Sequence, residues 1–377
     1  MSQLLLRRLS KLSPRNGSLI HDEKARLFST SNPYLPLECT GEALPGGRII
    51  ANVLLYDSAK QELLSVPGKT VSGEFYNGKL VGASHGWTFS FDRRDRLVSM
   101  SDIFNPVASK TEMTMVPLPP LSTLESCQSQ VFWNVAMSSQ DEEDEDWVVA
   151  IKFLGRQLSL CRPRRDLRWT NILTPFSYSN LMYSKRDQCF YLPAPGGYHL
   201  LSYDLNFQKD KEEDPKFHEL RFRDLPDLPQ SEWELLLGSC CKTEYLVESA
   251  ATGEHFLVKW YYILTSAFNF VYAQSYLHYG YSYITKRFMV FREEETLEGR
   301  YMCYTEDIGD MCIFLSNSEA FCVQASSFPG LKSNSIYFIG KGFGIYDLTS
   351  GSSSPFECPE GAPATLALPY WFPPFSF

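Results

Sequence analysis

Hydrophobic and polar residues alternate over short runs along most of the chain, and turn-forming residues separate these runs. Asn77-Gly78, a pair that favours a tight hairpin turn, stands between two such runs. Because successive side chains of a strand point to opposite faces of its sheet, an alternation with a period of two predicts β-strands. The pattern predicts antiparallel hairpins within residues 71–100, 189–205, 243–260 and 320–348. No stretch has the period of a long amphipathic helix.

The composition also favours strands. Aromatic residues make up 14% of the chain, with 26 Phe and 21 Tyr, and flat rings pack well on a half-buried pleated surface. With 44% hydrophobic and 21% charged residues in a chain of 377, the protein can bury a large core and is globular rather than disordered. We therefore predict an all-β fold of short antiparallel strands.

Four aspartates share one local pattern, because each ends an apolar or aromatic run: Asp57, Asp92, Asp204 and Asp347. An aspartate in this position can accept a hydrogen bond from the backbone two residues on and begin a turn. We therefore interpret the four as structural turn residues rather than catalytic acids. They stand 35, 112 and 143 residues apart, and the last two separations are near multiples of roughly 40–50 residues, the size of a propeller blade.

This spacing predicts a β-propeller. At that period the chain would form roughly seven or eight blades, although the irregular intervals leave the number of blades open. A pair of β-sandwiches is the alternative architecture for the same strands.

The first thirty residues differ from the rest of the chain in charge. Their basic residues are Arg7, Arg8, Lys11, Arg15, Lys24 and Arg26, against only Asp22 and Glu23. A basic start with leucines at helical spacing predicts a mitochondrial transit peptide over residues 1–28. Arg26 and Phe28 then precede the cleavage point, and Ser29 begins the mature chain.

A short linker over residues 29–44 and a β-propeller-like domain over residues 45–377 complete the predicted organisation. We expect the protein in the mitochondrion. The alternatives are the chloroplast and, if the basic segment is a simple tail, the cytoplasm or nucleus.

The charge of the chain bears on its partners. The formal net charge is -9, and loss of the basic N-terminal segment would make the protein more acidic. Such a protein is a poor candidate for nucleic-acid binding, which depends on Lys and Arg at phosphates. The basic cluster at 162–169 is predicted as a turn. The acidic runs at 140–146, 209–216 and 292–299 are predicted as solvated loop tips that could select basic protein partners.

No pattern predicts a metal or a cofactor. The ten cysteines contain no C-x-x-C pair, and we interpret them as free thiols in a reducing compartment. The glycine-rich GKGFG at 340–344 follows one predicted strand and enters another, so it lacks the helix N-terminus of a phosphate loop. The uncharged stretch 260–284 is long enough to span a bilayer, but its polar residues and tyrosines favour two strands with an aromatic insertion. Membrane attachment through it stays an alternative.

Several segments resemble, in order, the plant proteins grouped as domain of unknown function 295. The resemblance is carried by GASHGWTF…NP…LPPL (82–121), CRPRRDLRWTNI (161–172), FYLPAPGG…YDL (190–205), YLVES (245–249), the GD…FPGLKSNSIYF block (309–338) and PYWFPP (369–374). It implies a kelch-like propeller from about residue 45 to the end. The family's R-P-G-D element has Arg164 and Arg165 here in place of glycine.

The resemblance bears on function as well. Many relatives carry an F-box ahead of the domain and act as substrate receptors of ubiquitin ligases. Here a transit-type segment stands in that place, so the chain resembles an organelle-targeted branch, and a ubiquitin-ligase role is disfavoured. The resemblance implies no catalytic residues.

The function that the sequence favours is a non-enzymatic organellar scaffold that binds proteins, with a regulatory or stress-related role among the options. Nothing in the sequence assembles a nucleophile, a base and an oxyanion site. A hydrolase or lyase that uses acids in the central channel is the alternative, so an enzymatic role stays open. The identity of the partner and the oligomeric state do not follow from the sequence.

Overall fold

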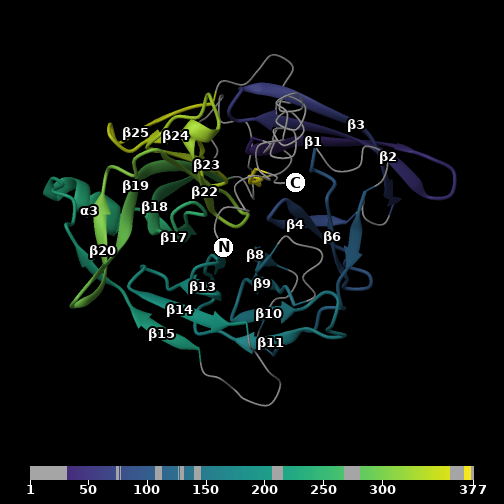
Figure 1. The fold of residues 1–377 in the computed structure, drawn as a ribbon, viewed down its shortest axis with the longest axis horizontal. Coiled ribbons are helices and arrows are strands. Elements are labelled where there is room, and N and C mark those ends of the chain that lie inside the picture. Colours follow the sequence, from purple (N-terminus) through teal and green to yellow (C-terminus); the bar gives the residue numbers. More distant parts are fainter. Residues whose placement is uncertain are drawn as a thin grey trace, which may run out of the picture.

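Six β-sheets are arranged as blades around a central axis (Figure 1). The computed structural model describes residues 32–73, 76, 78–106, 113–125, 127, 131–139, 146–205, 215–266, 281–356 and 369–374. Within these residues the predicted all-β propeller is confirmed, and the alternative of two β-sandwiches is wrong.

The first three blades follow the chain in order. Blade 1 contains β1 (Tyr34–Ala43), β2 (Arg48–Asp57) and β3 (Glu62–Ser72). Blade 2 contains β4 (Lys79–Ser84), β5 (Trp87–Phe91), β6 (Val98–Ser101) and β7 (Met115–Pro117). Blade 3 contains β8 (Phe132–Met137), β9 (Val149–Phe153), β10 (Gln157–Cys161) and β11 (Thr170–Leu173).

Blade 4 has the same simple order, whereas blades 5 and 6 each have five strands, one of them out of sequence order. Blade 4 contains β12 (Met182–Ser184), β13 (Cys189–Pro193), β14 (His199–Asp204) and β15 (Lys216–Glu219). Blade 5 has the order β17 (Cys241–Glu248), β18 (His255–Ser266), β19 (Tyr281–Thr296), β20 (Gly299–Thr305) and β16 (Arg221–Arg223), the last parallel to β20. Blade 6 has the order β22 (Phe321–Gln324), β21 (Met311–Leu315), β23 (Ser335–Ile339), β24 (Phe343–Asp347) and β25 (Ser352–Ser354). The short helices are α3 (Gln230–Gly238) and η2 (Ala325–Ser327).

Neighbouring blades pack on each other through apolar clusters. Along β17, Tyr245 and Val247 face the cluster shared with blade 6, and Leu246 between them faces the cluster shared with blade 4. Each blade is thus covered on both faces, which explains strands such as β9 and β21 whose residues are all buried. The period of two remains, but in β21 both sets of positions are apolar, and in β9 the only charged residue is the buried Lys152.

The innermost strands contact one another in the order β4, β8, β12, β17 and β22 and surround the central channel. The ring is closed by the C-terminal segment. Phe372 exchanges two backbone hydrogen bonds with Tyr34, of 3.1 and 2.9 Å. Residues 369–374 therefore take the innermost place of blade 1, whose other strands come from the N-terminal part of the described chain.

The predicted number of seven or eight blades is wrong, because the structure has six in the described residues. The innermost strands β4, β8, β12 and β17 begin at Lys79, Phe132, Met182 and Cys241, so one blade takes about 50–60 residues. Each blade is longer than the expected period of roughly 40–50 residues because its strands and connections are long.

Strand β1 covers most of the segment predicted as a linker. Residues 34–43 pair with β2 along their length, so the described propeller includes them. Residues 1–31, with the predicted cleavage residues Arg26, Phe28 and Ser29, lie outside the described part of the chain.

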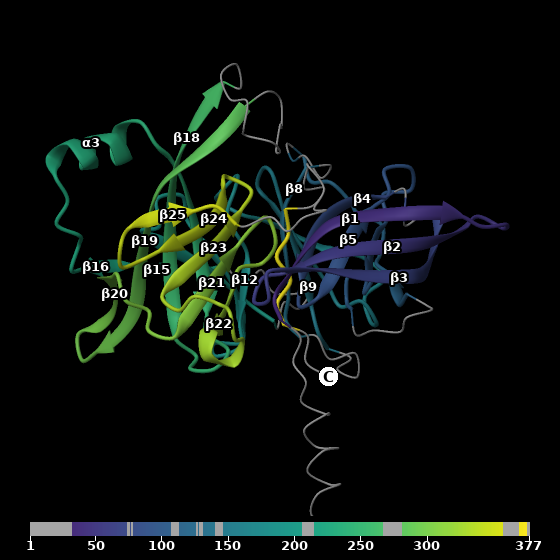
Figure 2. The same cartoon turned by 90° about the horizontal axis from the view of Figure 1, so that it is seen from above.

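The stretch 260–284 lies in the long hairpin of β18 and β19, and residues 267–280 are outside the described residues. The strand interpretation is confirmed for its two described ends. Figure 2 shows β18 and β19 extending beyond the other blades on the same side as α3. Among the helices of the described residues, none is long and apolar enough to cross a membrane.

The side chain of Trp371 anchors the closing segment. It is fully buried against Phe314, at 5.2 Å between ring centroids, and against Phe356, at 5.6 Å. We expect Trp371→Ala to lower the free energy of unfolding by about 3–5 kcal/mol, the usual cost of truncating a buried aromatic residue.

Urea denaturation followed by circular dichroism measures this loss. The matched control is Leu297→Ala, because Leu297 is fully exposed at the turn between β19 and β20, and we expect it to change the free energy by less than about 0.5 kcal/mol. A loss below about 1 kcal/mol for Trp371→Ala would show that ring closure does not depend on this side chain.

Candidate functional site at the mouth of the central channel

A cavity of about 300 Å³ opens where the innermost strands end. The ends of β4, β12 and β17 supply its polar rim, and β22 and the C-terminal segment supply most of its apolar wall. Its polar and titratable residues are Ser84, His85, Tyr183, Lys185, Glu248, Glu319 and Cys322. We call this space the mouth cavity.

The carboxylate of Glu319 lies in the mouth cavity and joins four blades. Glu319 follows β21 in blade 6. Its Oε2 accepts a hydrogen bond of 2.5 Å from the hydroxyl of Ser84 in blade 2, and its Oε1 accepts one of 2.8 Å from the backbone N–H of Tyr183 in blade 4. The backbone of Met137 in blade 3 also donates to this carboxylate.

The environment of Glu319 favours its neutral form. Burial raises its pKa to about 7, although the bonds from Ser84, Tyr183 and Met137 and the charge of Lys185 act in the opposite direction. No ion pair involves Glu319 in the described residues. The carboxyl group is therefore held by neutral donors and titrates near neutral pH.

His85 reaches the mouth cavity through a tight turn. His85 and Gly86 have φ angles of 48° and 82°, and Ser84 pairs with Trp87 across them, which is the backbone of a two-residue hairpin with positive φ at both positions. Burial, together with the charge of Lys185, lowers the pKa of His85 to about 4. Its imidazole is neutral at physiological pH.

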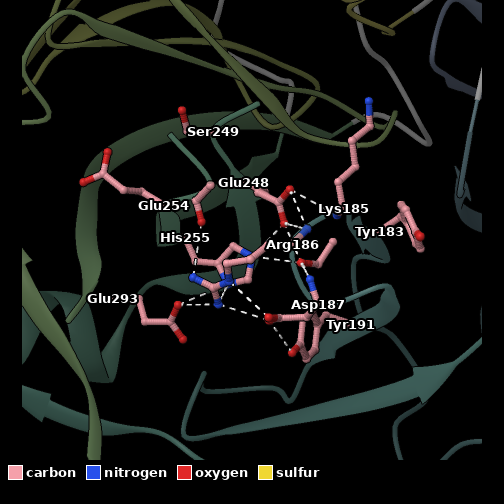
Figure 3. A network of polar contacts seen from close by, with 12 residues as sticks. Tyr183, Lys185, Arg186, Asp187, Tyr191, Glu248, Ser249, Glu254, His255 and Glu293 are labelled. Atoms are coloured by element: carbon pink, nitrogen blue, oxygen red, sulfur yellow. Dashed lines mark hydrogen bonds and ion pairs between the residues drawn. The ribbon is translucent and has the colours of Figure 1, made fainter. Parts of the chain in front are cut away.

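A polar network continues from Glu248 between blades 4 and 5 (Figure 3). The Nε2 of His255 lies 2.9 Å from Glu248, and its Nδ1 lies 3.3 Å from Glu293. Arg186 pairs with Glu293 at 2.6 Å and with Asp187 at 3.0 Å. Burial lowers the pKa of His255, but its hydrogen bonds to the two glutamates outweigh burial, so the pKa lies above the ordinary value.

Within this network Ser184, His255 and Glu293 are connected in the way that the hydroxyl, imidazole and carboxylate of a catalytic triad are. The hydroxyl of Ser184 lies 3.2 Å from Nε2 of His255. However, Ser184 is fully buried, and its hydroxyl donates to Glu248 at 2.5 Å, so its proton is not directed at the imidazole and no substrate reaches its oxygen. The arrangement instead holds the β12–β13 turn of blade 4 against blade 5.

The predicted turn aspartates lie at separate blades and are not brought together. Asp57 Oδ1 accepts hydrogen bonds of 3.0 Å from the backbone of Ala59 and Lys60. Asp92 accepts one of 2.8 Å from Arg94, two residues on. Asp347 and Asp204 end strands β24 and β14, and Asp347 accepts a bond of 2.8 Å from the backbone of Ser350.

The other segments named in the sequence have local roles. The basic cluster 162–169 is the turn between β10 and β11, as predicted. GKGFG forms the turn between β23 and β24, where the ammonium of Lys341 lies 5.6–5.7 Å from four aromatic rings. The predicted solvated loop tip at the acidic run 292–299 is wrong for its first half: residues 292–296 end β19, and Glu293 is largely buried in the network. Glu298 lies at the exposed turn and pairs with Arg223. Residues 140–145 and 209–214 lie outside the described residues.

The cysteines and potential metal ligands give no further site in the described chain. Nine cysteines are free thiols there, and Cys358 lies outside it. Within the same residues no group of three or more His, Cys, Asp or Glu side chains is placed to hold a metal ion.

Comparison with known proteins identifies one family. The family model described as KIB1-4 beta-propeller matches residues 55–354, well over half of the chain. No sequence among the curated proteins matches significantly.

Solved structures of low similarity include a protein of unknown function from Bacteroides thetaiotaomicron, with 10% identity and a TM-score of 0.31 over 61% of this chain and 55% of that one. The Cps50 (Swd1) β-propeller domain of Myceliophteria thermophila has 11% identity and a TM-score of 0.30 over 65% and 66%. The periplasmic gluconolactonase PpgL of Pseudomonas aeruginosa has 11% identity and a TM-score of 0.34 over 67% and 63%. The chain thus spans between about half and two thirds of these proteins.

The raised pKa of Glu319 predicts a pH-dependent stability. The pKa is about 7 in the folded protein and ordinarily 4.5, so the stability that the protonated group contributes is present below about pH 4.5 and is lost as the pH rises toward 7. Between pH 5 and pH 8 we expect the wild type to lose about 2–3 kcal/mol more free energy of unfolding than Glu319→Gln, since one pKa unit corresponds to about 1.4 kcal/mol.

Denaturant unfolding at several pH values provides the comparison. Because the slope with pH is compared, any uniform loss from the substitution itself cancels. Glu62→Gln, at the exposed start of β3, is the control and should keep the wild-type slope. Equal slopes for the wild type and Glu319→Gln would contradict the assigned titration.

Proposed function

Because this chain belongs to the KIB1-4 beta-propeller family, we propose that it is a non-enzymatic scaffold that binds other proteins. The observation that supports this most is that the polar groups of the channel bind neighbouring blades to one another. Glu319, Glu248 and His255 hold neighbouring blades together through hydrogen bonds and ion pairs. Such a ring is a rigid support for loops and for the mouth cavity, which is the usual arrangement of a binding surface on a β-propeller.

We further propose that the scaffold acts in an organelle, with the mitochondrion as its location. The basic segment at residues 1–28 supports this, because it has the charge and leucine spacing of a transit peptide. In that setting the partners are proteins of the mitochondrial matrix.

A hydrolase or lyase is the second candidate. Its support is that Glu248, Glu319 and His85 line one cavity. General acid–base catalysis needs a carboxyl group that is free to exchange a proton with a substrate. Here Glu248 is paired with His255, and Glu319 accepts hydrogen bonds from several blades, so the contacts support the scaffold better.

Proximity labelling in plant cells tests the scaffold and its location together. We expect the full-length protein, fused at its C-terminus to a labelling enzyme, to label a reproducible set of matrix proteins. A form that lacks residues 1–28 should lose this set, because import needs the basic segment.

The labelling enzyme directed to the matrix on its own gives the background. If the full-length fusion labels matrix proteins no more strongly than this background, the proposed scaffold function is contradicted. Labelling of cytosolic ubiquitin-ligase subunits by the full-length protein would contradict the organellar location and favour a receptor role.

A further inference from the structure

Glu319 differs from Glu248 and Glu293 because it forms no ion pair in the described part of the chain. Glu248 pairs with His255, and Glu293 pairs with Arg186 and His255. Glu319 is held by a hydroxyl and by backbone N–H groups, which are neutral. A carboxylate removed from bulk water without an opposite charge is costly, and a cation that reaches it recovers part of that cost.

None of the other described titratable groups of the mouth cavity forms an ion pair with Glu319. His85 is uncharged at neutral pH, and burial raises the pKa of Cys322 to about 12, so its thiol is neutral as well. The carboxylate of Glu248 is held by the hydroxyl of Ser184 and by Nε2 of His255. Lys185 is exposed at the rim, where water screens its charge. That charge favours the ionised form of Glu319, but the two groups form no ion pair. Figure 3 shows the side chain of Lys185 directed away from Glu248 and His255.

The walls of the mouth cavity suit a long side chain with a charged end. They include Met182, Phe321, Val323, Pro373 and Pro374. Aliphatic stems of Lys and Arg pack favourably on such surfaces while their charged ends seek a polar partner. A cavity of about 300 Å³ holds one side chain of this size together with part of the backbone on either side of it.

We infer that the mouth cavity binds a basic side chain of an extended protein segment, whose guanidinium or ammonium group pairs with the carboxylate of Glu319. This inference rests on the proposed scaffold function and names the chemistry of its partner. The net charge of the chain, -9, favours the approach of a basic partner through long-range attraction. The carboxylate is already held in place by several blades. Binding of the segment therefore does not need to order this part of the ring, which lowers the cost of binding.

Fluorescence anisotropy with a labelled peptide, acetyl-Ala-Ala-Arg-Ala-Ala-amide, tests the site in the full-length chain. The matched peptide contains citrulline, which keeps the shape of arginine and removes its charge. We expect the arginine peptide to bind at least about tenfold more tightly than the citrulline peptide, since an ion pair shielded from water is worth on the order of 1.4 kcal/mol or more.

Three variants locate the binding. Glu319→Gln should weaken binding of the arginine peptide at least about tenfold. Ala250→Trp places a bulky side chain at the exposed edge of the cavity, without touching Glu319, and should weaken it to a similar extent even if Glu319→Gln is poorly folded. Glu62→Gln, remote on β3, should leave it unchanged. Binding should also weaken about tenfold from pH 8 to pH 6, because protonation of Glu319 removes the charge.

Several results would overturn the inference. Equal binding of the arginine and citrulline peptides, no saturable binding at millimolar peptide, or unchanged binding by both cavity variants overturns the inference. Free butylguanidinium that binds as tightly as the peptide shows a site for a small cation and overturns the assignment to a protein segment. If proximity labelling identifies partners and the peptide does not bind, the scaffold stands and this site fails.

Discussion

The hydrogen bonds to the carboxylate of Glu319 hold four blades together at the channel end of the propeller, and the rest of this region depends on them. The innermost strand of each blade is a sheet edge, and the backbone N–H groups on its channel side have no neighbouring strand as acceptor. Apolar packing cannot satisfy these groups. Glu319 accepts the N–H of Tyr183 and a backbone bond from Met137, and Asn134 accepts the N–H of Leu181 in the same way. Side chains of one blade thus complete the exposed edge of another.

The blades are therefore joined by two kinds of contact, apolar packing between their faces and polar contacts at their inner edges. Apolar clusters fill the space between blade faces and contribute most of the burial. Polar side chains act at the channel edges. Elsewhere, buried lysines are held by backbone carbonyl groups of the protein. Lys69 and Lys152, both fully buried, donate to backbone carbonyls at distances that include 2.7 Å in each case. Glu319 is the acidic counterpart, because its partners are donors.

The sequence predicts features that depend on neighbouring residues. The turn at Asp92 needs only the backbone two residues later, and the alternating hydrophobic pattern needs only one strand. The number of blades depends on the lengths of connections, which vary without a sequence signal. The candidate site was missed for the same reason: Ser84 and Glu319 are 235 residues apart, and Ser184 and Glu248 are 64 apart. Their pairing follows from ring closure, which no local pattern encodes.

Partner binding and cohesion of the blades are linked through Glu319, because the same carboxylate takes part in both. When this group ionises, the folded state bears a charge whose desolvation exceeds the compensation from its hydrogen bonds and from Lys185, and that charge lowers stability. A basic side chain that binds only the assembled ring restores the balance and adds stability in proportion to its occupancy. The cohesion of four blades would thus be greatest when the partner is present, so the scaffold and its ligand would stabilise each other without any change of shape.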